Sequence, residues 1–265
     1  MITFPNCKIN LGLHVVGKRP DGYHDLETIF LPVHSLRDEL EINPIEPSLS
    51  SGGTALAPCM QQGGLALDNA PDDNLCMHAW RLLHEEFGIP PVNIRLKKGI
   101  PFGAGLGGGS SDAAFTLKML NEMFSLSLTD SQLEQRAARL GADCAFFIKN
   151  EPAYATGIGD QLSPIDLDLS AYRIIIEIPE GEHVSTKEAY GGLKRDLFDT
   201  KRPDLRAAVK HPIEDWRNLI VNDFETSVFP AHPAIAALKE DMYRRGALYA
   251  SMTGSGAAVF GIFAK

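Results

Sequence analysis

A glycine-rich stretch in the middle of the chain restricts the possible folds most strongly. The residues PFGAGLGGGSSDAA, from Pro101 to Ala114, contain five glycines and run directly into an apolar helical pattern. Glycine adopts backbone angles that other residues avoid, and it lets a ligand approach the main chain. A glycine loop that leads into a helix directs unpaired N–H groups and the positive end of the helix dipole toward one point, which suits a phosphate. We therefore predict a phosphate-binding loop for a nucleoside triphosphate rather than a merely mobile surface loop.

Two common phosphate-binding motifs do not account for this loop. A P-loop needs a lysine followed by a serine or threonine after its last glycine, whereas Ser110 follows Gly109 directly here. The glycines between residues 103 and 108 match the dinucleotide fingerprint formally. That fingerprint also needs an acidic residue at the end of a second strand, and Glu122, near that spacing, lies on a helical pattern. An NAD-dependent oxidoreductase stays open as an alternative.

The composition narrows the class of ligand. A formal net charge of −9 argues against a nucleic-acid-binding protein but not against a nucleotide held by loop amides and a few lysines. The four cysteines are scattered, so we expect neither a zinc site nor disulfides. This pattern fits a reducing compartment. The sequence shows no signal peptide and no membrane-spanning run. We expect a cytoplasmic protein with a small-molecule substrate and no nucleic-acid or membrane partner, as a monomer or a weak homodimer.

The order of the predicted elements favours an α+β fold. Strands are predicted over residues 2–16, 26–33, 39–42, from 92, from 173, and on both sides of a glycine turn in 249–263. Helices are predicted from Asn74 to a stop at Gly88, behind the glycine loop, over 129–141 with a Thr129/Gln132 capping box, over 185–193, and up to Gly246. Residues 44–73 predict one or two strands in long loops. This order is not strict βαβ alternation, which favours α+β with a boundary near residue 152.

The first predicted strand and a glycine-terminated helix supply two candidate catalytic residues. Asn6, Lys8 and Asn10 alternate with apolar residues, which predicts that one face of the strand lies outside the core. Asp143 follows the glycine that ends a helix. Taken singly, Lys8 could be an edge-strand charge and Asp143 a turn residue. Next to a triphosphate, they supply the cation and the carboxylate that phosphoryl transfer needs.

Three motifs resemble those of the GHMP kinase superfamily. They are KINLGLHVVGKRPDGYHDLETIF from Lys8, the glycine loop, and TGSGAAVFGIF from Thr253, and together they span nearly the whole chain. The resemblance implies an α+β, two-domain GHMP kinase fold. Residues 1–152 would be an ATP-binding domain like ribosomal protein S5 domain 2, and residues 153–265 a ferredoxin-like domain. The motif from Lys8 narrows the resemblance further, and it implies transfer of phosphate from ATP to the 2-hydroxyl of a cytidine diphosphate-linked methylerythritol, in the non-mevalonate (MEP) pathway of isoprenoid biosynthesis.

The resemblance also implies roles for individual residues. Asp143 would be the base, and Lys8 would hold Asp143 and the charge of the transition state. Mg²⁺ would bridge the phosphate oxygens, with Ser110 as a protein ligand. ATP would contact Asn74, Lys98, Pro101, Gly103, Ala104, Gly105, Leu106, Gly107, Gly108, Gly109, Ser110, Ser111 and Asp112. The acceptor would contact Asn10 at its methylerythritol end, and Tyr23, His24, Thr186 and Tyr190 around the cytosine, where an aromatic ring can stack on the base.

Other functions stay open beside this one. The acceptors of homoserine and mevalonate kinases carry no nucleobase, so the Tyr23-His24 pair favours the cytidylyl acceptor over these two. A nucleotide-binding regulator without catalysis would not need both Lys8 and Asp143. The chain departs from the family pattern at Ala145, where a proline is usual, and at Cys7, where a small residue such as alanine is common. Relatives often continue past the third motif with another helix, so we expect a slimmer C-terminal domain.

Overall fold

The chain folds into two compact units, each assembled from separate stretches of sequence. The computed structural model describes residues 1–45, 57–66, 70–193 and 202–265. The first unit comprises residues 1–7, 34–102 and 107–150, and the second comprises residues 8–33, 103–106 and 151–265. The chain therefore passes between the units after residues 7, 33, 102, 106 and 150. The crossing after residue 150 lies beside the boundary expected near residue 152. The division into one domain before this boundary and one after it stays a prediction.

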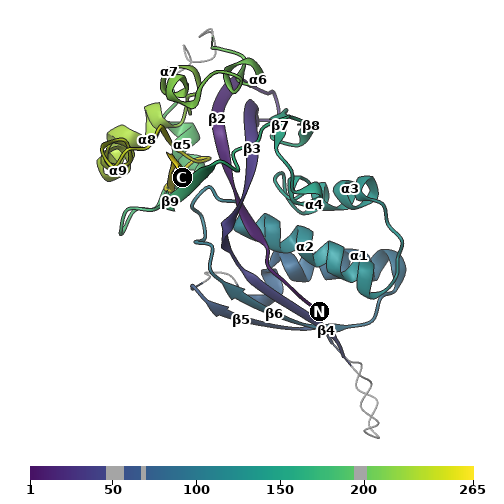
Figure 1. Ribbon diagram of the computed structural model, residues 1–265. Helices are drawn as coiled ribbons and strands as arrows, with labels where there is room; N and C mark the ends of the chain where they lie inside the picture. Colours follow the sequence, from purple (N-terminus) through teal and green to yellow (C-terminus); the bar gives the residue numbers. More distant parts are fainter. Residues whose placement is uncertain (46–56, 67–69, 194–201) are drawn as a thin grey trace, which may run out of the picture. The chain divides into compact units, whose positions relative to one another are not determined.

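The first unit is a sheet with helices along one face (Figure 1). Its strand order is β1 (Ile2–Thr3), β4 (Glu39–Pro44), β6 (Val92–Lys98), β5 (Cys59–Gly64), and only β5 and β6 among these pairs run parallel. The helices are η1 (Pro71–Asp73), α1 (Leu75–Phe87), α2 (Gly108–Met123), α3 (Asp130–Leu140) and α4 (Phe146–Lys149). Alternate residues of β6 are buried and exposed, as in a strand with one covered face. The buried side chains of β6 therefore line the core beneath α1 and α2.

Local sequence signals place the helix ends of this unit. Asn74 caps α1, because its side chain accepts a hydrogen bond from the Cys76 N–H, and Gly88 ends the helix with φ +66°. The capping box of Thr129 and Gln132 at the start of α3 is confirmed. In the expected loop region 44–73, β5 and η1 are the elements within the described residues. Residues 46–56 and 67–69 lie outside the described part.

Two further sheets lie in the described part of the second unit. One has the order β2 (Asn6–Lys18), β3 (His24–Arg37), β7 (Ala153–Thr156), β8 (Gln161–Pro164), and the other has the order β10 (Tyr249–Met252), β11 (Val259–Ala264), β9 (Tyr172–Glu177). Its helices are α5 (Thr186–Gly191), α6 (Leu205–Ala208), η3 (Ile213–Asp215), α7 (Trp216–Leu219), α8 (Glu225–Ala231) and α9 (Pro233–Arg244). One core joins Val15 of β2, Met242 of α9 and Val259 of β11. This core supports the strands that carry the N-terminal and C-terminal motifs.

The prediction that one face of the first strand lies outside the core is wrong. The stretch 2–16 forms β1 and β2, and the first ten residues of β2 are all buried. Asn6, Lys8 and Asn10 lie inside the protein, with 2%, 3% and 2% of their surfaces exposed. Each makes hydrogen bonds to protein groups, which offsets the cost of leaving water. The alternation in the sequence therefore marks a buried polar network and not a solvent-facing edge.

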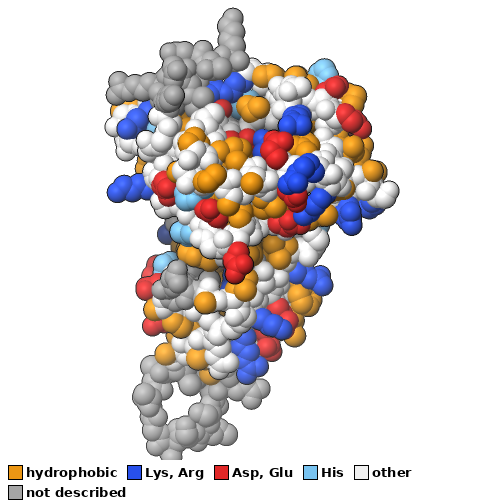
Figure 2. Space-filling model, turned by 90° about the vertical axis from the view of Figure 1, so that its left-hand side faces the viewer, with side chains coloured by type: hydrophobic (Ala, Val, Ile, Leu, Met, Phe, Trp, Pro, Cys, Tyr) orange, Lys and Arg blue, Asp and Glu red, His pale blue; other side chains and the backbone are white. Residues whose placement is uncertain are grey.

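The surface drawn in Figure 2 carries acidic and basic side chains interspersed among apolar ones. Opposite charges also pair elsewhere in the described residues, as in the ion pairs of Arg245 with Glu177 and Asp241. Exposed pairs of this kind contribute little to stability. Among the helices of the described residues, we find no segment with the length and apolar character needed to cross a bilayer.

Candidate active site

The glycine loop has the backbone conformation that its sequence predicts. Gly103, Gly105 and Gly107 have φ values of +67°, +78° and +71°, in the left-handed region that favours glycine. A Cβ atom on Gly105 would lie 2.2 Å from the carbonyl oxygen of Thr253, so this approach of two backbones excludes a side chain. Gly107 is the N-cap of α2. The loop therefore leads into a helix N-terminus, and its three glycines with positive φ carry no side chain that could obstruct a phosphate.

The first turn of α2 lies beside the turn that carries Asp143. Ser110 and Cys144 form a side-chain hydrogen bond. A Cβ atom on Gly141 would lie 3.2 Å from Cys144 Sγ and 3.9 Å from Ser110 Oγ. Burial raises the pKa of the Cys144 thiol to about 11, so this cysteine stays protonated and unreactive near neutral pH. Ser110, the predicted metal ligand, and Asp143, the predicted base, thus come from neighbouring turns of one unit.

A buried ion cluster connects the end of β6 to the first turns of α2. Lys98 Nζ donates to a carboxylate oxygen of Asp38 and, at 2.7 Å, to Asp112 Oδ2. The three side chains are at most 3% exposed. Asp38 Oδ1 also accepts the N–H groups of Gly99 and Ile100, at 2.6 and 2.8 Å. Asp38 therefore fixes the chain where it leaves β6 for the glycine loop.

This cluster changes how two predicted ATP contacts are understood. Lys98 and Asp112 were expected near the adenosine, and the structure shows both bonded inside the protein; their contact with ATP stays a prediction. Burial raises the pKa of Asp112 to about 8, although Lys98 beside it acts in the opposite direction. Asp112 Oδ1 is buried without a hydrogen-bond partner among the described residues. Sequence reasoning missed Asp38, because a single aspartate between two strand patterns carries no recognisable signal.

Two further predicted ATP contacts flank this region. Asn74 is mostly buried, and its Oδ1 accepts the Cys76 N–H at 2.9 Å as the cap of α1. Pro101 is half-buried at the start of the glycine loop. For both residues, a contact with ATP stays a prediction.

Lys8 is fixed against the glycine loop within the second unit. Its Nζ donates to Asn10 Oδ1 at 2.6 Å and to the carbonyl oxygen of Gly105 at 3.0 Å. It also lies 5.1 Å from the centre of the Phe30 ring. The backbone N–H of Lys8 donates to the Leu106 carbonyl at 2.9 Å. A positive charge is thus held beside the predicted phosphate loop by both the main chain and the side chain.

Both polar atoms of the Asn10 side-chain amide form hydrogen bonds within the protein. Its Oδ1 accepts from Lys8, and its Nδ2 donates to Thr28 Oγ1 at 3.0 Å. Its backbone N–H donates to Thr253 Oγ1, also at 3.0 Å. The predicted contact of Asn10 with the methylerythritol end of the acceptor stays a prediction. Thr28 of β3 and Thr253, which follows β10, are site residues to which sequence reasoning assigned no individual role. A threonine in a strand such as Thr28 is ordinary, and Thr253 stands out in the sequence only as the first residue of the third motif.

Two of the predicted cytosine contacts stack on each other. The rings of His24 and Tyr190 lie 4.5 Å apart at 22°, and Tyr190 meets the ring of Phe224 edge-on. Burial, with a smaller effect of Lys18, lowers the pKa of His24, so its ring is neutral at pH 7 and has one donor and one acceptor nitrogen. Neutral imidazole next to an aromatic face suits a nucleobase.

The remaining acceptor residues lie near this aromatic wall or on the surface. Thr186 Oγ1 lies 3.3 Å from Ser255 Oγ in the third motif. Tyr23 is 62% exposed, so its ring is accessible for stacking. Lys8 belongs to the second unit and Asp143 to the first, so their direct pairing stays a prediction. Among the described residues, no three His, Cys, Asp or Glu side chains form a metal cluster.

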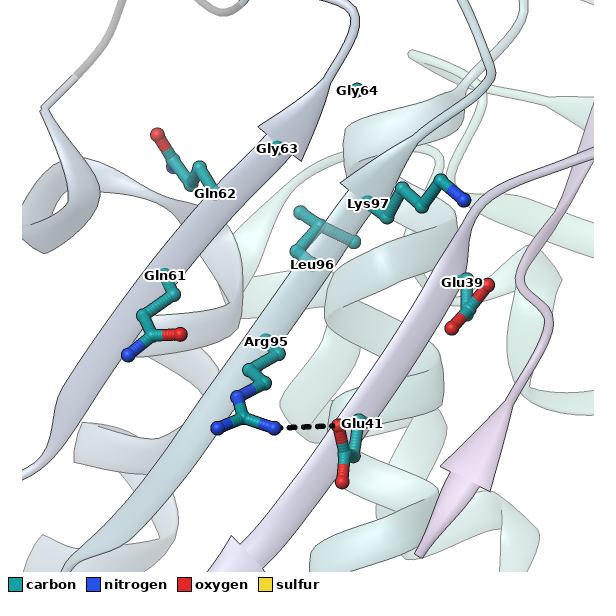
Figure 3. A pocket seen from close by; sticks show the side chains of 9 residues that line it. All are labelled: Glu39, Glu41, Gln61, Gln62, Gly63, Gly64, Arg95, Leu96 and Lys97. Carbon is teal, nitrogen blue, oxygen red and sulfur yellow. Dashed lines mark hydrogen bonds and ion pairs between the residues drawn. The ribbon is translucent and has the colours of Figure 1, made fainter.

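A separate hollow lies on the open face of the first unit's sheet (Figure 3). It is lined by Glu39, Glu41, Gln61, Gln62, Gly63, Gly64, Arg95, Leu96 and Lys97. Arg95 and Glu41 are register partners and form an ion pair at 3.5 Å. None of these lining residues belongs to the predicted site. Opposite charges on neighbouring strands offset one another here, so the hollow lacks the net positive charge that a phosphate would need.

Comparison with protein families identifies the fold and the class of enzyme. The model of the GHMP kinases N terminal domain matches residues 74–151, and the model of the GHMP kinases C terminal domain matches residues 204–265. Together they match more than half of the chain. The chain belongs to the GHMP kinase family. The two-domain GHMP kinase fold of class α+β is confirmed, and a nicotinamide-dependent oxidoreductase is excluded.

Individual relatives of this GHMP kinase agree in name. It is 50% identical over 263 residues to the 4-diphosphocytidyl-2-C-methyl-D-erythritol kinase of Bacteroides fragilis, covering 99% of this chain and 92% of that protein. The kinase of the same name from Porphyromonas gingivalis is 47% identical over 264 residues, covering 99% and 92%. A crystal structure of 4-(cytidine 5'-diphospho)-2C-methyl-D-erythritol kinase matches with a TM-score of 0.81 at 31% identity, over 99% of this chain and 90% of the other. The mevalonate kinase of Methanococcus jannaschii, with a TM-score of 0.70 at 15% identity over 99% and 90%, shares the fold.

Proposed function

We propose that this GHMP kinase transfers the γ-phosphoryl group of ATP to the 2-hydroxyl of 4-diphosphocytidyl-2-C-methyl-D-erythritol. The reaction belongs to the non-mevalonate pathway of isoprenoid biosynthesis and takes place in the cytoplasm. The proposal rests on the 50% identity, over 99% of the chain, to a kinase named for that substrate. The stacked His24–Tyr190 wall supports it, because kinases of homoserine or mevalonate have no base for such a wall to hold.

ATP binds at the glycine loop in this proposal. The amides of residues 103–109 and the N-terminus of α2 surround the phosphates, and Ser110 and Ser111 follow in the first turn. Lys8, held against the Gly105 carbonyl, offsets the negative charge that develops during transfer. Residues 1–152 act as the ATP-binding domain and residues 153–265 as the C-terminal domain. The end of the first family match at residue 151 and the start of the second at 204 support this division.

Asp143 acts as the base that orients or deprotonates the 2-hydroxyl of the acceptor. A carboxylate suits this role because the attacking oxygen must lose its proton as it bonds to phosphorus. The hydrogen bond between Ser110 and Cys144 keeps the Asp143 turn next to the first turn of α2. The acceptor's cytosine lies against Tyr23, His24 and Tyr190, with Thr186 nearby and Asn10 toward the methylerythritol end.

The donors near the loop fit a magnesium ion that binds mostly to the nucleotide. Ser110 Oγ offers one hard oxygen ligand at the helix N-terminus, and Asp143 belongs to the adjacent turn. Mg²⁺ usually keeps several waters and takes only one or two protein ligands beside substrate phosphates. When bound, the ion neutralises charge on the β- and γ-phosphates. A magnesium site of this kind therefore does not require a cluster of acidic side chains.

A panel of acceptors tests the proposed function. ATP consumption is measured with 4-diphosphocytidyl-2-C-methyl-D-erythritol, mevalonate and homoserine, and the phosphorylated position is mapped by NMR. We expect turnover with the cytidylyl compound and phosphate on its 2-hydroxyl. Preferential turnover of mevalonate or homoserine would overturn the assignment of the acceptor. ATP binding without transfer to any of the three would favour a nucleotide-binding regulator.

A further inference from the structure

A buried line of hydrogen bonds decides which end of the Asn10 amide faces Lys8. Thr28 of β3 is 1% exposed, and its hydroxyl donates to the Gly12 carbonyl oxygen at 2.5 Å. A hydroxyl has one proton, so Thr28 Oγ1 meets Asn10 only as an acceptor. It accepts from Asn10 Nδ2 at 3.0 Å. The Asn10 carbonyl oxygen therefore faces the other way, where it accepts from Lys8 Nζ at 2.6 Å.

The start of this line is fixed by the backbone of β2. Gly12 has φ +66°, and a Cβ atom there would lie 2.6 Å from a methyl group of Leu205. Both conditions keep a glycine at this position. The Gly12 carbonyl is thus a fixed acceptor, and it sets the direction of the Thr28 hydroxyl and of every bond that follows.

A second threonine supports the same arrangement from the opposite side. Thr253 is fully buried, and its Oγ1 accepts the Asn10 N–H at 3.0 Å. The same hydroxyl lies 3.3 Å from both Asn10 Oδ1 and the Gly105 carbonyl oxygen. These two oxygens are the ones that bind the Lys8 ammonium. The ammonium therefore lies between two acceptors whose own positions depend on threonine hydroxyls.

We propose that Thr28 is a positioning residue for phosphoryl transfer, which acts through Asn10 to hold the Lys8 ammonium against the glycine loop. The proposal rests on the proposed function insofar as Lys8 takes part in the reaction. Without the Thr28 hydroxyl, Asn10 Nδ2 is left buried without its acceptor, so the amide loses the bond that fixes its position and direction. A displaced Asn10 amide no longer places its Oδ1 at 2.6 Å from the Lys8 ammonium. The ammonium is then held by the Gly105 carbonyl oxygen without this second acceptor, and it shifts relative to the glycine loop.

Two substitutions at Thr28 separate the hydroxyl from the shape of the side chain. Thr28→Val keeps the size and removes the hydroxyl, whereas Thr28→Ser keeps the hydroxyl. Because small displacements of a catalytic group can reduce the rate about 100-fold, we expect Thr28→Val to lower kcat roughly 10- to 100-fold, with a smaller change in the KM for ATP. Thr28→Ser should stay within a few-fold of the wild type. A merely structural role would not give a kcat loss that the serine variant rescues.

A matched control and a readout independent of activity complete the test. Thr226→Val makes the same chemical change in the same unit, at a hydroxyl that donates to the Asp223 carbonyl at 2.7 Å and not to the Asn10 network; it should leave kcat unchanged. The hydrogen exchange of the Asn10 side-chain amide, followed by ¹⁵N NMR, should be slow in the wild type and Thr28→Ser and faster in Thr28→Val. Wild-type kcat in Thr28→Val, equal losses in both Thr28 variants, or an unchanged exchange rate would overturn the proposal. If the wild type phosphorylates none of the acceptors, the proposed function fails, while the exchange rate still tests the bond between Thr28 and Asn10.

Discussion

The buried cluster of Lys98, Asp38 and Asp112 should make the stability of the protein depend on pH in an unusual direction. Two carboxylates share one ammonium there, and burial raises the pKa of Asp112 to about 8. An aspartate in an unfolded chain has a pKa of about 3.9. Between these values, the folded protein keeps a proton that the unfolded chain releases. The free energy of unfolding therefore falls as the pH rises, by about 1.4 kcal/mol per pH unit for one proton.

Asp112→Asn removes this titration and leaves the side chain almost the same size. The difference in unfolding free energy, variant minus wild type, should increase by roughly 2 to 3 kcal/mol between pH 5 and pH 7. Above pH 8 it should level off, because both states of the wild type are then ionised. The sign is the reverse of that for an aspartate with a lowered pKa, whose contribution is lost on acidification.

Urea unfolding at pH 5 to 9 measures this difference. Trp80 lies in α1 of the first unit and Trp216 in the second, so a Trp216→Phe background makes Trp80 fluorescence specific for the unit that holds the cluster. Glu39→Gln, next to Asp38 but on the exposed face of β4, is the matched control for loss of one carboxylate. Parallel curves for the wild type and Asp112→Asn from pH 5 to pH 7 would refute the assignment of the proton to Asp112.

Three further predictions concern the site itself. Asp143→Asn should lower kcat by at least about 100-fold and leave ADP affinity, measured by calorimetry, within a few-fold; normal turnover would exclude Asp143 as the base. Tyr190→Ala removes the ring that stacks on His24, so the KM for the cytidylyl acceptor should increase about 10-fold or more while the KM for ATP stays unchanged. Steady-state kinetics with each substrate varied in turn measures both constants, and an equal increase in the two KM values would contradict this role of Tyr190. Gly105→Ala places a Cβ 2.2 Å from the Thr253 carbonyl oxygen, so ADP binding should be lost at a temperature where circular dichroism shows a folded protein; retained affinity would contradict the packing argument.

Local signals in the sequence predict much of this fold. The caps at Asn74 and Thr129 and the positive φ values of the loop glycines depend on a few neighbouring residues, so a sequence contains what is needed to find them. The burial of Lys8 and Asn10 depends on partners far along the chain, such as Thr253. For this reason, the alternation of polar residues predicted an exposed face where a buried network lies. The same distance hides Asp38, whose partners are 60 or more residues away.

The interleaving of the two units has a consequence for protein engineering. Strand β3 comes from residues 24–37 and its neighbour β7 from residues 153–156, with Ile29 opposite Tyr154. A gene divided at residue 152 therefore separates hydrogen-bonded strands of one sheet. Its two products should behave as halves for complementation, each with an open strand edge that the other covers. A split reporter of this kind would convert the joining of two polypeptides into recovery of kinase activity.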